Sequence, residues 1–215
     1  MTSSPAPRVL ACASVKPPYV YDTDEIQPYL LRWLRSKDPS LVDRLEKIVA
    51  SIQIARRASA IPLEQVFAPA GFEAKNNRYI ESAIEHAGRA FQAGIERAGV
   101  AADEIDFLIT TSCTGFMIPS VDAHLVNRFG LKRTVQRLPV LQMGCAGGTS
   151  ALIYASDYLR AHPDHRVAVV SAEFPSVTFQ ENDLSIANIV STALFADGAA
   201  CAVLGGPLEI SDFSG

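Results

Sequence analysis

The stretch QMGCAGGTS, residues 142–150, lies where a predicted strand passes into a predicted helix. The run before it, 135–141, is mostly hydrophobic and predicts a buried strand. The run after it, 149–159, carries no charge until Asp157 and predicts a helix that is buried on most sides. Cys145 is therefore expected between a buried strand and the first turn of a buried helix.

This position makes Cys145 a candidate nucleophile, because unpaired N–H groups and the positive end of a helix favour a thiolate. A free cysteine has a pKa of about 8.5, and a shift to about 6 would raise the thiolate fraction at pH 7 from about 3% to about 90%. Most cysteines are packing residues, but packing does not require three glycines within three residues. The motif is neither the dinucleotide fingerprint nor the hydrolase elbow, which would need glycine at Met143.

Length and composition exclude several classes of protein. The 215 residues can form one large domain or two small ones, and 48% hydrophobic with 20% charged residues is typical of a globular protein. The net charge of −4 gives no basic face for nucleic acid. No apolar segment reaches transmembrane length, and the N-terminus lacks the pattern of a secretory signal. We therefore expect neither a nucleic acid nor a membrane as partner.

The four cysteines are widely spaced and form no CxxC pair: they are Cys12, Cys113, Cys145 and Cys201. This spacing argues against a zinc site and against a disulfide framework. It fits a reducing compartment, so the sequence predicts a cytoplasmic protein without a metal.

Strands and helices alternate from Phe107 onward, which predicts an α/β fold with a mostly parallel sheet and helices on both faces. Segment 58–74, with its prolines and glycine, is expected to be irregular, and Asn76 and Asn77 are expected to cap the longest helix. The predicted strands are 8–15, 107–112, 135–141, 166–172 and 199–204, and the predicted helices lie near 26–34, 40–55, 78–98, 120–129, 149–159 and 185–195.

Three segments occur in an order that resembles the type III polyketide synthases, the chalcone/stilbene synthase family of the thiolase superfamily. They are TTSCTGFMIPSVDAH (110–124), LPVLQMGCAGGTSAL (138–152) and VTFQENDLSIANIVSTALFADGAA (177–200). The resemblance covers about residues 40–206 and is most specific at GCAGG and ALFADGAA. It implies a thiolase-like fold with αβαβα layers built from two similar halves. Residues 1–215 would form the N-terminal domain of a homodimer, with the C-terminal half absent from this chain.

The resemblance also implies an activity. Cys145 would accept a starter acyl group from coenzyme A, and decarboxylated malonyl-CoA would then condense onto that thioester. Coenzyme A thioesters would be substrates, and no cofactor is implied. The remaining implied roles are substrate binding for Cys113, Thr178, Ser191 and the gatekeeper Phe195, coenzyme A phosphate binding for Arg44 and Lys47, and reach into the partner's cavity for Ile118. A third basic position of the family corresponds here to Ser51.

In the family, a histidine and an asparagine of the second half activate malonyl-CoA, and that half would follow Gly215. None of His86, His124, His162 and His165 lies in a matching segment, and His86 is expected on the polar side of its helix. Two alternatives stay open. One is a condensing enzyme of the ketoacyl synthase III type. The other is a non-catalytic remnant that binds acyl-CoA or a partner subunit. The sequence specifies neither the starter nor the product.

Overall fold

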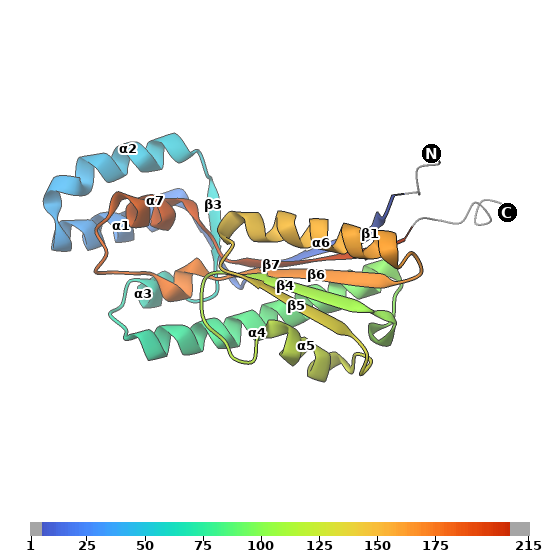
Figure 1. The fold of residues 1–215 in the computed structure, drawn as a ribbon. Coiled ribbons are helices and arrows are strands. Elements are labelled where there is room, and N and C mark those ends of the chain that lie inside the picture. Colours follow the sequence, from blue (N-terminus) through green and yellow to red (C-terminus); the bar gives the residue numbers. More distant parts are fainter. Residues whose placement is uncertain (1–5, 207–215) are drawn as a thin grey trace.

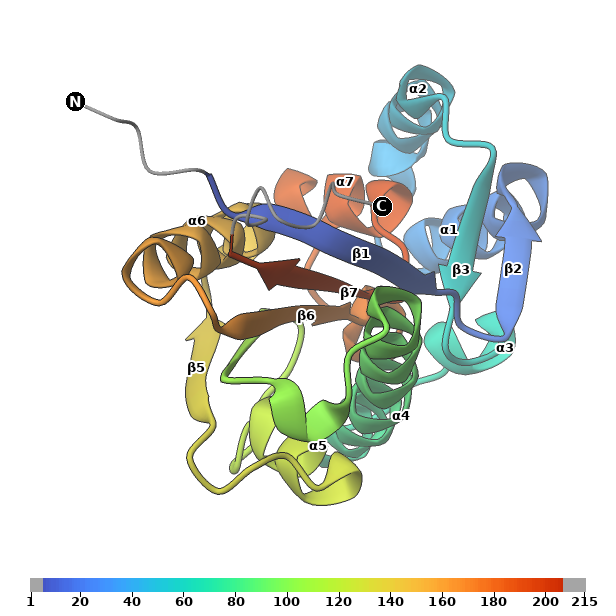
Figure 2. The same ribbon diagram turned by 90° about the vertical axis from the view of Figure 1, so that its right-hand side faces the viewer.

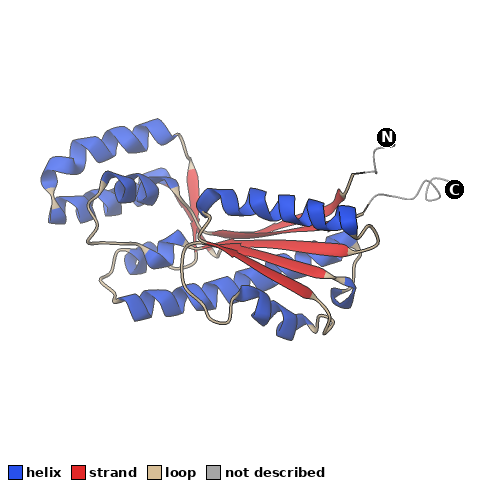
Figure 3. Ribbon diagram, in the orientation of Figure 1, coloured by secondary structure: helices blue, strands red, loops and turns tan. Residues whose placement is uncertain are grey.

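A five-stranded sheet lies between helices on its two faces, and a smaller helical lobe adjoins one end of it (Figures 1 and 3). The computed structural model describes residues 6–206. The sheet has the order β1-β7-β6-β4-β5. Its strands are β1 (Arg8–Val15), β4 (Phe107–Ser112), β5 (Gln136–Leu141), β6 (Arg166–Glu173) and β7 (Gly198–Gly205).

Four of these strands share one direction. β4 pairs in parallel with both β5 and β6, whereas β7 runs antiparallel to its neighbours β6 and β1. The connection from β6 to β7 leaves the sheet for the lobe and returns at the same end (Figure 1), so it is not a βαβ crossover. The mostly parallel sheet is therefore confirmed, with β7 as the exception.

Helices α4 (Phe72–Ala98) and α5 (Val121–Phe129) cover one face of the sheet, and α6 (Gly147–Ala161) lies on the other (Figure 2). Each face has its own apolar cluster. The α4 side buries Phe91, Leu108 and Leu125 completely, and the α6 side does the same with Ile109 and Leu159. Full burial of one such side chain contributes roughly 1.5–3 kcal/mol by area, so both faces stabilise the sheet.

The lobe combines segments from both ends of the described chain around a third cluster that includes Trp33, Leu34, Leu45 and Ile189. Asp22 is the N-cap residue of α1, and its N–H donates to Glu25 Oε2 at 2.7 Å. The lobe elements are β2 (Tyr19–Asp22), α1 (Thr23–Lys37), η1 (Pro39–Leu41), α2 (Val42–Ile52), β3 (Arg56–Ser59), α3 (Leu63–Val66), η4 (Pro175–Thr178) and α7 (Ile186–Leu194); the short turns η2 (Ala102–Glu104) and η3 (Gly144–Ala146) lie by the sheet.

Two predictions for the segment before α4 were wrong. The segment 58–74 contains the end of β3 and the short helix α3, and α4 begins at Phe72 after the N-cap Gly71. Asn76 therefore lies inside the helix. Its side-chain amide donates to Phe116 O and accepts from Phe116 N–H, both at 2.9 Å. The side chain therefore holds a distant loop and does not cap the helix.

Burial was overestimated for β5 and α6. β5 is an edge strand of the described sheet, where Pro139 removes no ladder hydrogen bond, and only Val140 is buried. α6 buries Ala151, Ala155 and Leu159 but exposes an apolar face: Leu152 is 41%, Ile153 53% and Tyr154 42% exposed. Within residues 6–206 no further layer covers this helix.

His86 is buried and does not lie on a polar face as expected. Its Nδ1 lies 2.9 Å from Ser82 O, and its ring centroid lies 5.2 Å from that of Phe174. The segment after β6 packs across α4 at this point, a contact that the helix periodicity alone does not reveal.

Candidate functional site

Cys145 is exposed in the short turn η3, between the end of β5 and the start of α6. Two residues of this connection have left-handed backbone conformations, Gln142 with φ of 61° and Gly144 with φ of 54°. Glycine adopts this conformation without strain, whereas it is uncommon for glutamine. These two residues reverse the chain after β5 and place the thiol at the carboxyl end of the parallel strands.

The glycines after Cys145 have a different role from Gly144. A Cβ at Gly147 would meet Thr111 at 3.5 Å, and one at Gly148 would meet Ser171 at 3.8 Å, which are ordinary contacts. Backbone conformation therefore requires glycine only at position 144. The other two lie where α6 begins against the strands β4 and β6.

Cys113 follows the last residue of β4 and faces the same region. Its N–H donates to Glu173 Oε1 at 3.0 Å and to Oε2 at 3.2 Å. Burial, the Glu173 carboxylate and the neighbouring Cys145 together raise the pKa of the Cys113 thiol to about 11, with burial as the largest cause. Cys113 therefore remains a neutral thiol at physiological pH.

A cavity of about 590 Å³ brings Cys113 and Thr178 together, under the loop that contains Phe116. A second cavity of about 180 Å³ is lined by Thr178, Ser191 and Phe195. Thr178 lines both cavities, so it is adjacent to Cys113 on one side and to Ser191 and Phe195 on the other. Cys145 lines neither cavity.

Arg44 and Lys47 are both exposed on α2, and within residues 6–206 neither forms an ion pair. α2 packs against α7, the helix of Ser191. The two cations therefore lie on the lobe surface, where a polyanion would reach them from solvent. Ser51, the third position, uses its hydroxyl to donate to Ile48 O at 2.8 Å.

Ile118 is fully exposed, at 101%, on the loop between β4 and α5. Phe116 on the same loop and Phe72 at the start of α4 are 61% and 70% exposed, and their ring centroids lie 6.5 Å apart. Gly115 makes this loop possible, because a Cβ there would lie 2.2 Å from the ring of Tyr79. The loop thus projects apolar side chains outward.

Sequence reasoning missed Glu173 and Asp197. Glu173 directly follows the predicted strand 166–172 and is the last residue of β6, and a charge at the carboxyl end of a parallel strand is a signal that could have identified it. Asp197 is buried, which raises its pKa, and it accepts from Ala60 N–H at 2.6 Å and Ser176 N–H at 2.9 Å. It therefore fixes the turn that carries Thr178.

Residues 2–207 match the family described as chalcone and stilbene synthases, N-terminal domain. The chain is 33% identical over 164 residues to 1,3,6,8-tetrahydroxynaphthalene synthase of Streptomyces griseus, covering 76% of this chain and 44% of that protein. It is 33% identical over 159 residues to phloroglucinol synthase of Pseudomonas fluorescens, covering 74% and 46%. The chain thus spans less than half the length of these curated relatives.

Two solved structures superpose with a TM-score of 0.85. One is 1,3,6,8-tetrahydroxynaphthalene synthase of Streptomyces coelicolor, a bacterial type III polyketide synthase, with 30% identity over 91% of this chain and 56% of that one. The other is germicidin synthase of the same species, a type III polyketide synthase, with 28% identity and coverage of 96% and 61%. None of the helices in residues 6–206 is both long and apolar enough to cross a membrane.

Proposed function

The chain belongs to the chalcone and stilbene synthase family of type III polyketide synthases and has its thiolase-like fold, and from this premise we propose that it is the acyl-accepting part of such an enzyme. The observation that carries the proposal is the exposed Cys145 thiol at the carboxyl end of the sheet, where Cys113 lines a cavity of about 590 Å³.

In the proposed first step, the Cys145 sulfur attacks the carbonyl carbon of a starter acyl-CoA. A new S–C bond forms at Cys145, the S–C bond of the coenzyme A thioester breaks, and coenzyme A leaves as the thiolate. Arg44 and Lys47 would hold its phosphates by charge at the lobe surface. The neutral thiol of Cys113 would line the wall beside the bound acyl group and would not compete as a nucleophile.

In the proposed second step, malonyl-CoA loses carbon dioxide, and the resulting carbanion attacks the Cys145 thioester. A C–C bond forms, the Cys145 thiolate is released, and the lengthened ketoacyl chain remains on coenzyme A. Thr178, Ser191 and Phe195 would line the space for this chain. The histidine and asparagine that activate malonyl-CoA would come from a C-terminal half outside residues 1–215, so the isolated chain is expected to accept acyl groups without condensing them.

The exposed loop with Ile118 and Phe116 supports a homodimer in which Ile118 approaches the partner's cavity. A cytoplasmic location is part of the same proposal, because the exposed thiols require reducing conditions. The family match favours a polyketide synthase over a condensing enzyme of the ketoacyl synthase III type.

Acyl transfer can be measured directly on this chain. Incubation with a short acyl-CoA should add one acyl mass to the protein, and peptide mapping should place it on Cys145. Cys145→Ala should lose the adduct, whereas Cys12→Ala, which removes another exposed thiol, should keep it. An adduct retained in the Cys145→Ala variant, or no adduct with any acyl-CoA, would contradict the proposal.

A further inference from the structure

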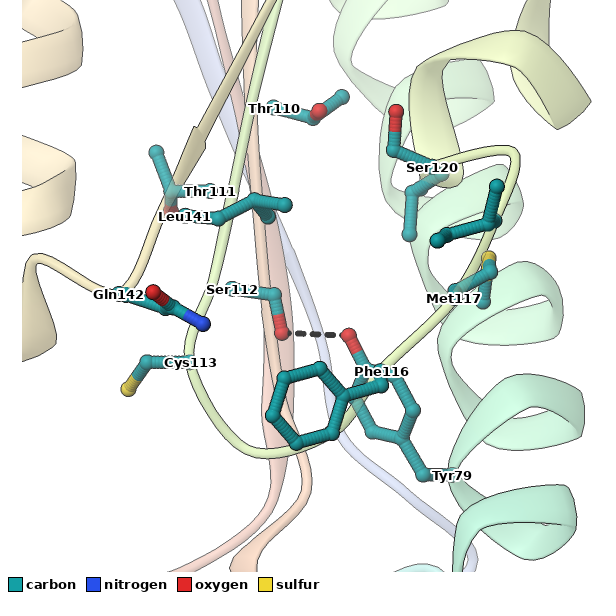
Figure 4. Close-up of a pocket in the computed structure, with 13 residues that line it drawn as sticks. Tyr79, Thr110, Thr111, Ser112, Cys113, Phe116, Met117, Ser120, Leu141 and Gln142 are labelled. Carbon is teal, nitrogen blue, oxygen red and sulfur yellow. Dashed lines mark hydrogen bonds between the residues drawn. The ribbon is translucent and has the colours of Figure 1, made fainter.

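The cavities at the carboxyl end of the sheet belong to the candidate site. Figure 4 shows the smallest of them, of about 160 Å³, with Cys113 and Gln142 at one edge and Tyr79 OH 2.7 Å from Ser112 Oγ. A separate cleft of about 630 Å³ opens on the helical lobe, between α1, the end of α3 and the segment 179–183, and none of the candidate site residues named above lines it. Small-molecule sites are typically clefts of about 300–1,000 Å³ lined by aromatic side chains and a few polar groups.

Aromatic side chains form one wall of this lobe cleft. The ring centroids of Tyr29 on α1 and Phe67 at the end of α3 lie 5.7 Å apart, with 28° between the ring planes. Phe67 lies 5.2 Å from Phe179, whose ring meets that of Trp33 edge-on at 4.9 Å. Tyr29 and Phe67 are half-buried and line the cleft, so part of each ring faces the open space. A planar aromatic group can therefore extend this stack.

The opposite wall, the segment 179–183, is held in place by side chains of three helices. Trp33 of α1 donates from Nε1 to Glu181 O at 2.9 Å. Asn188 of α7 donates to two further carbonyl oxygens of the segment at 2.7 and 2.9 Å, and Lys75 Nζ of α4 donates to another at 2.8 Å. The cleft is therefore pre-formed, which lowers the entropic cost of binding a ligand.

The charged groups of the lobe cleft favour an anion. Its two carboxylates have partners: Glu64 Oε1 accepts from the tyrosine hydroxyl of the aromatic wall, and Glu181 Oε2 lies 4.0 Å from Lys75 Nζ. Arg32 and Lys37 line the cleft from α1 and are both exposed, and within residues 6–206 neither forms an ion pair. The positive charge on this helix is therefore the part that remains uncompensated.

We propose that the lobe cleft is a second ligand site, which binds a small planar aromatic carboxylate without forming a covalent bond. The ligand ring lies against Tyr29 and Phe67, and its carboxylate faces the cations of α1. The guanidinium carbon of Arg32 lies 5.6 Å from the centroid of the Tyr29 ring, so the charge and the aromatic surface are adjacent. An arginine that stacks on a ring keeps its N–H fork available to both oxygens of a carboxylate. The site is independent of acyl transfer at Cys145.

The test uses 2-naphthoate and two analogues that each lack one recognised feature. 2-Naphthylmethanol has no charge, and decahydronaphthalene-2-carboxylate has no aromatic ring. Titration calorimetry at low salt should give 2-naphthoate a Kd at least about fivefold lower than that of either analogue. Trp33 is the single tryptophan of the chain and lines the cleft, so its indole N–H signal in a ¹H–¹⁵N spectrum should shift as 2-naphthoate binds.

Two substitutions on α1 locate the carboxylate. Arg32→Gln should raise the Kd of 2-naphthoate about fivefold at low salt and much less at high salt, because exposed charges are screened. Arg35→Gln is the matched control, since Arg35 is an exposed cation of the same helix that does not line the cleft, and it should leave the Kd unchanged. Equal melting temperatures of the two variants would show that both are folded.

Several results would overturn the inference. Equal affinity for 2-naphthylmethanol would indicate adsorption to an apolar surface, and a Trp33 signal that does not move would place the ligand elsewhere. Binding that survives Arg32→Gln but is lost when Arg44 and Lys47 are both replaced by alanine would assign it to the surface of α2. Absence of binding would refute the site outright. Cys145→Ala should bind 2-naphthoate as the wild type does, so a failure of the proposed acyl transfer leaves this result unaffected.

Discussion

The two ends of the sheet use their polar groups in opposite ways. At the amino end, Asp106 pairs with Lys132 Nζ, accepts from Arg166 N–H at 2.8 Å and lies 3.9 Å from His165 Nδ1. His165 Nδ1 in turn lies 2.8 Å from Tyr158 OH. At the carboxyl end, Gln142 and Gly144 have left-handed backbone conformations, Cys145 is exposed, and within residues 6–206 the Thr110 hydroxyl has no hydrogen-bond partner.

This difference shows where the fold is stabilised and where it can react. Satisfied, partly buried polar networks fix the geometry of a scaffold, whereas strained or unpaired groups gather where a ligand completes the structure. The amino end joins the starts of three strands through one carboxylate. At the carboxyl end, the Cys145 thiol is exposed to solvent. Changes at the two ends should therefore separate stability from activity.

The largest effect is expected for Cys145→Ala. Acyl transfer should fall by at least about a thousandfold, because the nucleophile that forms the thioester is lost. The melting temperature should change by no more than about 2 °C, since the side chain is exposed and supports no packing. Intact mass spectrometry measures acyl transfer, and calorimetry measures the melting temperature. A large loss of stability would contradict the separation of the two ends.

The opposite behaviour is expected for Asp106→Asn. Loss of the charge that holds Lys132 and the Arg166 N–H should cost about 2–3 kcal/mol, which lowers the folding equilibrium constant roughly 30- to 150-fold. Acylation per folded molecule should stay the same. Urea unfolding measures the cost, and Asp103→Asn, an exposed carboxylate nearby, is the control. An equal loss of unfolding free energy in Asp103→Asn would mean that the Asp106 network contributes nothing to stability.

The ionisation of Asp106 is expected to make the free energy of unfolding depend on pH. Burial acts to raise the pKa of Asp106, but the hydrogen bonds from Lys132 and Arg166 outweigh it, and the pKa is lowered in the folded state. Its stabilising contribution is therefore complete above the ordinary carboxyl pKa of about 3.9 and is lost as the pH falls through the lower folded value. Unfolding curves of wild type and Asp106→Asn should converge in this acidic range. Parallel curves would contradict the assignment.

An intermediate effect, on self-association, is expected for substitutions on the outward face of α6. This helix runs from the carboxyl end of the sheet to its amino end. Its exposed Leu152, Ile153 and Tyr154 should cause self-association of the isolated chain. Burying an isoleucine is worth roughly 1.5–3 kcal/mol, so Ile153→Lys should weaken association at least about tenfold. Sedimentation velocity at several concentrations measures this. Ala161→Lys, which adds the same charge at the helix end, should change association much less.

The smallest effect is expected for the exposed cations of α2. Arg44→Ala combined with Lys47→Ala should weaken binding of coenzyme A roughly three- to tenfold at low salt and hardly at high salt, because exposed charges are screened. Arg160→Ala, an exposed cation of α6 far from the lobe, should leave binding unchanged. Titration calorimetry at two salt concentrations tests this. Equal binding by the double variant at low salt would remove both residues from the site.

Periodicity predicted most elements, and several closely. β1 and β4 have the predicted bounds, and α6 and α7 lie within two residues of theirs. These segments form because their local pattern and their final environment agree. Cys145 was identified for a similar reason, since a glycine-rich turn between a strand and a helix is encoded within a few residues.

Only the tertiary structure decided which faces are covered. The start of α4 was misplaced because Asn76 bonds to a loop forty residues away, and β5 was called buried although it lies at the edge of the sheet. The unpaired Thr110 hydroxyl, the Asp106 network and the buried His86 depend on neighbours far apart in the sequence. A local pattern records what a residue prefers, whereas burial and hydrogen-bond partners are set by packing between distant segments. The sequence by itself therefore determined the elements, the family resemblance and the candidate nucleophile, and packing decided which polar groups remain free around it.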